Sequence, residues 1–335
     1  MKDLILKLAE KEGISDIHIQ SGLPIGLRIN GSIEKSDGQI AKKDDVTEFI
    51  AEILTADQQK VFNAEKSFDC GFSIKNTRFR ANIFESHNGT NIVLRILDDE
   101  IRAYSEVNFP PVIEETLMNQ NGLILVTGPT GSGKTSSIAS MIDYINQNSQ
   151  KNIITIEDPI EYIFKPSQSI ISQREVGDHT VSFASALKAA LREDPDVILV
   201  GELRDLETVS LALTAAETGH LVFATLHTSG AANTVNRIID VFPHGQQSQI
   251  RAQIATSLKL AITQRLIKKL DGGGRVPAFE VMVCNVAVQN LIREGKIFQI
   301  PNTLQTSAAD GMIGMKQSLD ALKADGIISY DEEPE

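Results

Sequence analysis

Hydrophobic and polar residues follow two different patterns along the chain, and the change falls near residue 100. Before that point, short apolar stretches alternate with polar residues at a period of two, which is typical of half-buried strands. The pair Asn30-Gly31 indicates a hairpin turn. Helices are expected up to about Gly13 and over residues 46–54. Short strands joined by turns predict a small α+β unit whose mostly antiparallel sheet has one polar face. The expected strands are residues 16–20, 26–30, 68–74, 77–84 and 90–97.

From about residue 112, continuous apolar runs alternate with helical stretches. One helix should start near Phe183 and end by Asp194, because Pro195 disfavours helical geometry in the residue before it. Asp205 is placed to cap a second helix, which runs to Thr218. This alternation predicts a parallel sheet covered by helices. The expected buried strands are residues 123–127, 152–156, 197–200 and 221–225.

Three further segments complete the expected organisation. Residues 98–111 are polar and end in two prolines, which predicts a linker without regular structure. Residues 247–270 carry an apolar stripe that predicts one long helix, followed by a strand over 276–283 and by short helices. Residues 331–335 form a polar tail. We therefore expect an N-terminal domain (1–100), a linker (101–111), an α/β domain (112–300) and a C-terminal helical segment (301–335).

Composition narrows the class of protein. The 335 residues are 41% hydrophobic and 23% charged, which is typical of globular chains and excludes disordered or fibrous ones. The net charge of −12 and the absence of Trp argue against a protein that mainly coats nucleic acid. No apolar stretch approaches the ~18 residues of a membrane span, and no signal peptide is indicated. Cys70 and Cys284 form no C-x-x-C pair and are expected to be buried, reduced thiols.

The motif with the clearest chemistry is GPTGSGKT at residues 128–135, which fits a phosphate-binding loop at every fixed position. It follows an apolar strand and precedes a helical stretch, as such a loop requires. The glycines let the backbone N–H groups turn inward, Lys134 supplies a cation for the β- and γ-phosphates, and the Thr135 hydroxyl is offered to Mg²⁺. The expected nucleotide-binding set is Gly128, Pro129, Thr130, Gly131, Ser132, Gly133, Lys134, Thr135 and Ser136.

Acidic residues and histidines follow the other apolar strands. Glu202 ends the run that starts at Asp196, and it is expected to orient or deprotonate the attacking water. Gly201 stands where an Asp usually precedes that Glu, which favours a metal held by Thr135 and water. Glu161 belongs to a second acidic group, and His227 ends a strand where an imidazole can respond to phosphate loss.

Five motifs in this order, GPTGSGKT, IEDPIEY, SQREVG, ALREDPDVILVGELRD and AAETGHLVFATLHT, closely resemble the secretion ATPases that drive type IV pili and type II secretion. The resemblance extends over residues 3–330. Within that family the chain looks most like the pilus retraction ATPases, the PilT-like twitching-motility group, because it lacks the four-cysteine module of assembly types. The segment VAVQNLIREGK also resembles this group, with Gln289 where an Arg is usual.

The resemblance implies a RecA-like P-loop NTPase domain preceded by a smaller α+β, PAS-like domain. It implies a homohexamer that uses ATP and Mg²⁺, lies in the cytoplasm at the inner-membrane face, and acts on an inner-membrane platform protein rather than on nucleic acid. By position, Glu202 corresponds to the catalytic Glu and Glu161 to the acidic-box Glu. The histidine box and the arginines that reach the nucleotide correspond to His220, His227, Arg80 and Arg95.

The favoured hypothesis is an ATPase that powers pilus retraction by depolymerising the filament. A pilus-assembly, type II secretion or conjugation ATPase of the same family is the nearest alternative. A RecA-like nucleic-acid translocase is an alternative of another class, and a regulatory subunit that binds ATP without hydrolysing it is a third.

Overall fold

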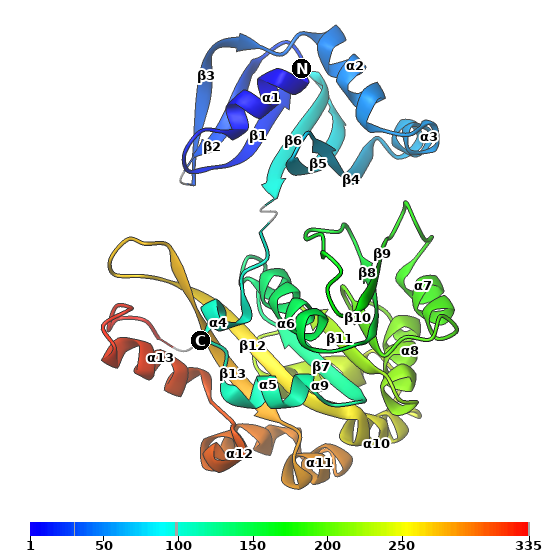
Figure 1. Cartoon of the computed structure of the whole chain (residues 1–335), viewed down its shortest axis with the longest axis vertical. Coiled ribbons are helices and arrows are strands. Elements are labelled where there is room, and N and C mark those ends of the chain that lie inside the picture. Colours follow the sequence, from blue (N-terminus) through cyan, green and yellow to red (C-terminus); the bar gives the residue numbers. More distant parts are fainter. Residues whose placement is uncertain (30, 98–99, 334–335) are drawn as a thin grey trace. The chain divides into compact units, whose positions relative to one another are not determined.

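The computed structural model describes residues 1–29, 31–97 and 100–333. These residues form two compact units, one of Met1–Glu100 with Pro159–Ile163 and one of Ile101–Asp158 with Phe164–Glu335. Each unit has its own sheet (Figure 1). Each also has its own hydrophobic core. The expected fold class, an α/β unit preceded by a smaller α+β unit, is therefore confirmed.

The first unit is built on a six-stranded sheet in the order β3-β2-β1-β6-β5-β4, in which all neighbouring strands are antiparallel. The antiparallel sheet was predicted, whereas β3 and α3 were not. Asn30, half of the predicted hairpin turn, lies outside the described residues. The elements are α1 (Lys2–Ala9), β1 (Ile14–Gln20), β2 (Pro24–Ile29), β3 (Ser32–Ile40), α2 (Lys43–Ile53), α3 (Ala56–Glu65), β4 (Ser67–Ile74), β5 (Thr77–Ser86) and β6 (Gly89–Leu97).

One face of this sheet packs against the helices and the other is polar. Ile5 of α1, Phe49 of α2 and Phe79 of β5 are at most 1% exposed and belong to one core cluster. Strand β5 alternates between such buried residues and partly exposed ones, among them Arg80. The predicted polar face is thus confirmed, and it carries arginines.

The second unit is built on a seven-stranded sheet in the order β13-β12-β7-β11-β10-β8-β9. All pairs are parallel except β12 with β13 at one edge. Every residue of β7, β10 and β11 is buried, which requires helices on both faces (Figure 1). The predicted helix-covered parallel sheet is confirmed. Its strands are β7 (Gly122–Thr127), β8 (Asn152–Glu157), β9 (Ile170–Glu175), β10 (Val197–Val200), β11 (Leu221–Leu226), β12 (Leu258–Lys268) and β13 (Arg275–Val283).

The helices of the second unit follow the expected caps where the sequence showed one. Asp205 Oδ1 accepts a hydrogen bond from the Thr208 backbone N–H at 2.9 Å, as predicted. Strand β9 and helix α9 were not predicted. The helices are α4 (Tyr104–Val107), α5 (Pro111–Leu117), α6 (Lys134–Asn148), α7 (Phe183–Ala190), α8 (Leu206–Glu217), α9 (Ala231–Asp240), α10 (Gln247–Ser257), α11 (Val286–Arg293), α12 (Ile300–Thr306) and α13 (Met315–Ala324), with short 3₁₀ turns at Ile297–Gln299 and Ala308–Asp310.

The long helix predicted over residues 247–270 is wrong. Helix α10 ends at Ser257, and β12 begins at the next residue. Strand β12 is bonded between β7 and β13, so its backbone groups are satisfied by the ladders on either side. The stripe misled the prediction because Leu258, Leu260 and Ile262 are buried in an interior strand, and an apolar run buried on both faces fits a helical spacing as well as a strand.

The expectation that residues 98–111 lack regular structure is also wrong, although residues 98–99 lie outside the described ones. Helix α4 lies within the segment, and Pro111 opens α5. Proline has no N–H to lose in the first turn of a helix, so the second proline starts a helix instead of preventing one. The Tyr104 ring lies 4.8 Å from the ring of Phe109 and 4.6 Å from that of Tyr144, which fixes α4 against α6.

Two smaller observations complete the description. Cys70 and Cys284 are buried, as expected. Among the helices of the described residues, none has both the length and the apolar character to span a bilayer.

Candidate functional site

The loop between β7 and α6 has the backbone conformation that its glycines predict. Gly128, Gly131 and Gly133 have φ values of +139°, +79° and +86°. A Cβ on Gly128 would lie 2.4 Å from the carbonyl oxygen of Gln264, so only glycine fits there. No side chain caps α6, which leaves the N–H groups of its first turn directed at the loop. Such a helix start favours an anion.

Lys134 is folded back into this loop. Its Nζ donates to the carbonyl oxygens of Gly128 and Pro129 at 2.8 and 3.1 Å and lies 3.3 Å from His227 Nδ1. The side chain is only 8% exposed. Ser132 Oγ is buried with no hydrogen-bond partner among the residues described. An inward cation, an unpartnered hydroxyl and a helix start that no side chain caps fit the phosphates of a nucleotide, and Thr135 is exposed in the first turn of α6.

Glu202 and His227 meet at the carboxyl ends of adjacent strands. Glu202 follows β10 and His227 follows β11, and these strands pair in parallel. Glu202 Oε1 lies 3.5 Å from His227 Nε2. Because His227 also reaches Lys134, the structure brings three predicted site residues into one set of contacts. A carboxylate beside a phosphate loop can orient a water for attack.

Gly201 has a packing reason to be glycine. Its Cβ would lie 3.1 Å from the Ile156 carbonyl oxygen, and its N–H donates to that same oxygen at 2.8 Å. The end of β10 therefore lies close against β8, and the position offers no carboxylate. That a metal here depends on Thr135 and water stays a prediction.

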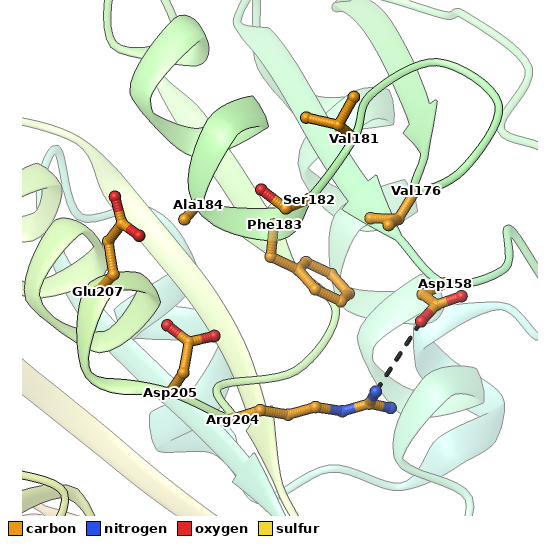
Figure 2. A pocket seen from close by; sticks show the side chains of 9 residues that line it. All are labelled: Asp158, Val176, Val181, Ser182, Phe183, Ala184, Arg204, Asp205 and Glu207. Atoms are coloured by element: carbon orange, nitrogen blue, oxygen red, sulfur yellow. Dashed lines mark ion pairs between the residues drawn. The ribbon is translucent and has the colours of Figure 1, made fainter.

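Arg204 is a member of this site that the sequence analysis missed. Its Nε donates to Glu202 Oε2 at 2.7 Å, and its Nη1 lies 3.9 Å from Asp158 Oδ2. Asp158 and Arg204 border a cavity of about 320 Å³, and Figure 2 shows Arg204 extended along one side of it. The sequence held a signal for Arg204, because it stands two positions after Glu202, just past a strand end, within the motif ALREDPDVILVGELRD.

His220 is not brought to the loop within this unit. It precedes β11, whereas His227 follows that strand. A strand of six residues separates them by about 20 Å. His220 Nδ1 lies 2.9 Å from the Ala215 carbonyl oxygen, at the C-terminal end of α8. Its assignment to the site stays an untested prediction.

Arg80, Arg95 and Glu161 belong to the first unit. Arg80 and Arg95 are directly opposite each other on β5 and β6, where like charges repel. Each has an acidic neighbour: Arg95 Nε lies 3.0 Å from Asp16 Oδ1, and Arg80 Nε lies 3.7 Å from Asp69 Oδ1.

Glu161 is held in the first unit through its backbone, since its carbonyl oxygen accepts from Arg78 Nη1 at 3.1 Å. The roles of Arg80, Arg95 and Glu161 toward a nucleotide remain predictions.

Comparison with known proteins gives a consistent result over the whole chain. The family model described as "Type II/IV secretion system protein" matches residues 1–317. The chain is 46% identical to a twitching motility protein of Neisseria gonorrhoeae over 90% of this chain and 81% of that one. It is 43% identical to the type IV pilus retraction ATPase PilT of Pseudomonas aeruginosa, over 97% and 94%. A crystal structure of the pilus retraction motor PilT with bound ADP superposes with a TM-score of 0.90 at 46% identity, covering 99% of this chain and 95% of that one.

Proposed function

The chain belongs to the type II/IV secretion system protein family, and we propose that it is an ATP-hydrolysing motor that retracts type IV pili. The observation that carries the proposal is the contact set of Lys134, His227 and Glu202 around a loop shaped for phosphates. It is supported by relatives named for pilus retraction and twitching motility that align over most of both chains.

The geometry suggests how the site works. Phosphates entering the loop compete for Lys134 with the two loop carbonyl oxygens, and they also meet the N–H groups at the start of α6, which no side chain caps. Glu202 then orients the attacking water. His227 touches both Lys134 and Glu202, so movement of the lysine toward a γ-phosphate changes the contacts of the imidazole. Thr135 would hold Mg²⁺, which neutralises charge on the phosphate oxygens.

The assembly we propose is a homohexamer in the cytoplasm, at the inner-membrane face of the pilus machine. Arg80 and Arg95 supply positive charge to the γ-phosphate, because phosphoryl transfer spreads negative charge over its oxygens. An inner-membrane platform protein receives the force. These statements rest on the family resemblance.

ATP turnover by the purified protein tests the proposal, measured with and without Mg²⁺. We expect Glu202→Gln to lower kcat by at least about 100-fold while nucleotide still binds, since general-base catalysis typically contributes 10²–10⁴-fold. Lys134→Ala should lose nucleotide binding as well. Lys316→Ala is the matched control, because that lysine pairs with Asp320 on an exposed helix surface and should leave turnover unchanged. Retained turnover in both site variants would exclude an ATPase centred on this loop.

A deletion strain separates retraction from the alternatives. Excess surface pili in the strain support retraction, whereas loss of pili or of secretion supports an assembly or secretion ATPase. Stimulation of turnover by DNA or RNA would instead favour a nucleic-acid translocase.

A further inference from the structure

Polar contacts continue along the sheet edge beyond the predicted site residues. The sheet order β7-β11-β10-β8 places four carboxyl strand ends in a row. Lys134, His227, Glu202 and Asp158 follow these four strands in that order. Lys134 Nζ lies 3.3 Å from His227, His227 lies 3.5 Å from Glu202, and Arg204 joins Glu202 to Asp158 at 2.7 and 3.9 Å.

Arg204 stands out in this row because nothing about its packing requires an arginine. Its side chain is 60% exposed, whereas that of Glu202 is 20% exposed. Figure 2 shows it extended along the rim of the cavity, with its guanidinium directed at Asp158. The neighbouring Asp205 carboxylate is already engaged by Thr208 N–H and Oγ at 2.9 and 3.0 Å. The guanidinium is therefore shared between Glu202 and Asp158.

The contact with Arg204 determines how the Glu202 carboxylate is oriented. A carboxylate has two equivalent oxygens and rotates freely unless one is fixed. Arg204 fixes Oε2 through a charge-assisted hydrogen bond and leaves Oε1 on the side of His227. Without the guanidinium, the imidazole and the Lys134 ammonium beyond it are the remaining donors of the row, and the carboxylate would turn toward them instead of toward water.

We propose that Arg204 is a positioning residue for ATP hydrolysis, which holds the Glu202 carboxylate in its working orientation and is itself anchored by Asp158. The inference rests on the proposed function. Arg204 acts through Glu202 and, within the part of the chain that the structure describes, forms no hydrogen bond or ion pair with the phosphate loop, so its loss should lower kcat and leave ATP binding intact.

Steady-state ATPase kinetics of the full-length protein test this. We expect Arg204→Met to lower kcat about tenfold or more, with KM for ATP within twofold of wild type, since a small misplacement of a catalytic group has effects of this size. Arg204→Lys keeps one charged donor and should recover most of kcat, whereas Asp158→Asn removes only the 3.9 Å anchor and should lower kcat two- to threefold. Arg293→Met is the matched control, because that arginine donates to Asn290 and Gln289 on α11.

Comparing the Arg204→Met, Glu202→Gln double variant with Glu202→Gln alone shows whether Arg204 positions Glu202 or only supports the structure. If Arg204 acts through Glu202, then Arg204→Met added to Glu202→Gln lowers single-turnover hydrolysis no further. A further tenfold loss in that background, an unchanged or raised kcat in Arg204→Met, or a large rise in KM would each overturn the inference. The proposed function is tested separately by the wild-type protein. If wild type hydrolyses ATP and the activity depends on Lys134 and Glu202, the proposed function stands even when the role of Arg204 is refuted. If wild type is inactive, the proposed function itself is refuted.

Discussion

The two sheets of this protein present their polar groups in different ways. The antiparallel sheet of the first unit is covered on one face, so alternate residues of its strands, including Arg80 and Arg95, lie on the other face. The parallel sheet of the second unit is covered on both faces, and β7, β10 and β11 are buried throughout. Its polar site residues therefore lie only past the strand ends.

The number of covered faces determines at which positions each sheet tolerates a substitution. A sheet buried on both faces keeps its chemistry at one edge, where loops are free to carry special residues. A sheet with an open face can place charges in its middle without burying them. Substitutions at matched positions of the two units test this contrast.

The largest effects are expected for the two buried aromatic rings. Phe79 in β5 and Phe223 in β11 are each 0% exposed. Replacing either by Ala should destabilise its own unit by about 3–5 kcal/mol through lost packing and a cavity. Because each ring belongs to a separate core and the phosphate loop lies in the second unit, Phe223→Ala should weaken nucleotide binding more than Phe79→Ala does. Chemical denaturation and nucleotide titration measure both, and an equal loss of binding in the two variants would contradict separate cores.

The next effect concerns the loop glycines. Gly128→Ala places a Cβ against backbone at φ +139°, whereas Gly131→Ala at φ +79° meets no atom within 4 Å. We expect Gly128→Ala to weaken nucleotide binding at least tenfold, and Gly131→Ala to act only through backbone strain of about 1–2 kcal/mol. Binding of a fluorescent ATP analogue measures both. Equal affinities would mean that the close approach to Gln264 is unimportant.

A smaller effect is expected on the open face of the first sheet. Arg95→Ala leaves Asp16, which is 5% exposed, with Arg28 at 3.8 Å and the Ser15 hydroxyl as partners. Loss of about 1–2 kcal/mol should follow from weakened pairing of a buried carboxylate. Arg80→Ala removes a longer contact to an acid, Asp69, that is more exposed than Asp16, and it should change stability by less than about 1 kcal/mol. Urea unfolding of both variants decides whether the two substitutions differ as the burial of their acidic partners requires.

The smallest effect is a pH dependence confined to the first unit. Burial lowers the pKa of His18 below its ordinary 6.5, with the nearby Asp16 raising it and Arg28 lowering it. The imidazole is neutral in both states above pH 6.5. As the pH falls below that value, the unfolded chain takes up the proton first, so stability declines until the lower folded pKa is passed.

The free energy of unfolding at pH 7.5 and pH 5.5 measures this effect. His18→Gln should reduce the difference between the two values relative to wild type. An identical difference in both proteins would show that His18 makes no contribution to the pH dependence.

Local rules in the sequence predicted much of the site. The spacing of Gly128, Gly131, Gly133 and Lys134 was sufficient to predict a loop whose N–H groups face a phosphate, because positive φ at these positions is a local demand of the chain. The cap at Asp205 was predicted from another local rule, since its carboxylate accepts from a backbone N–H three residues later. The order of apolar strands and acidic ends also placed Glu202 correctly at the carboxyl end of its strand.

Local rules failed where a partner distant in sequence decided the outcome. Strand β12 has a spacing that fits a helix, and only its neighbours β7 and β13 make it a strand. His220 and His227 share one motif but lie at opposite ends of β11. Arg204 was missed because its acceptors, Glu202 and Asp158, follow two different strands.

By itself, the sequence determined the phosphate loop, the two kinds of sheet and the residues that end each strand. These depend on backbone preferences and on hydrophobic period, which act over a few residues. The tertiary structure alone decided that the ends of β7, β11, β10 and β8 lie in one row, so that Lys134, His227, Glu202 and Arg204 touch. Strand order results from hydrogen-bonded pairing and burial among segments up to about a hundred residues apart, and no local pattern encodes which segments become neighbours.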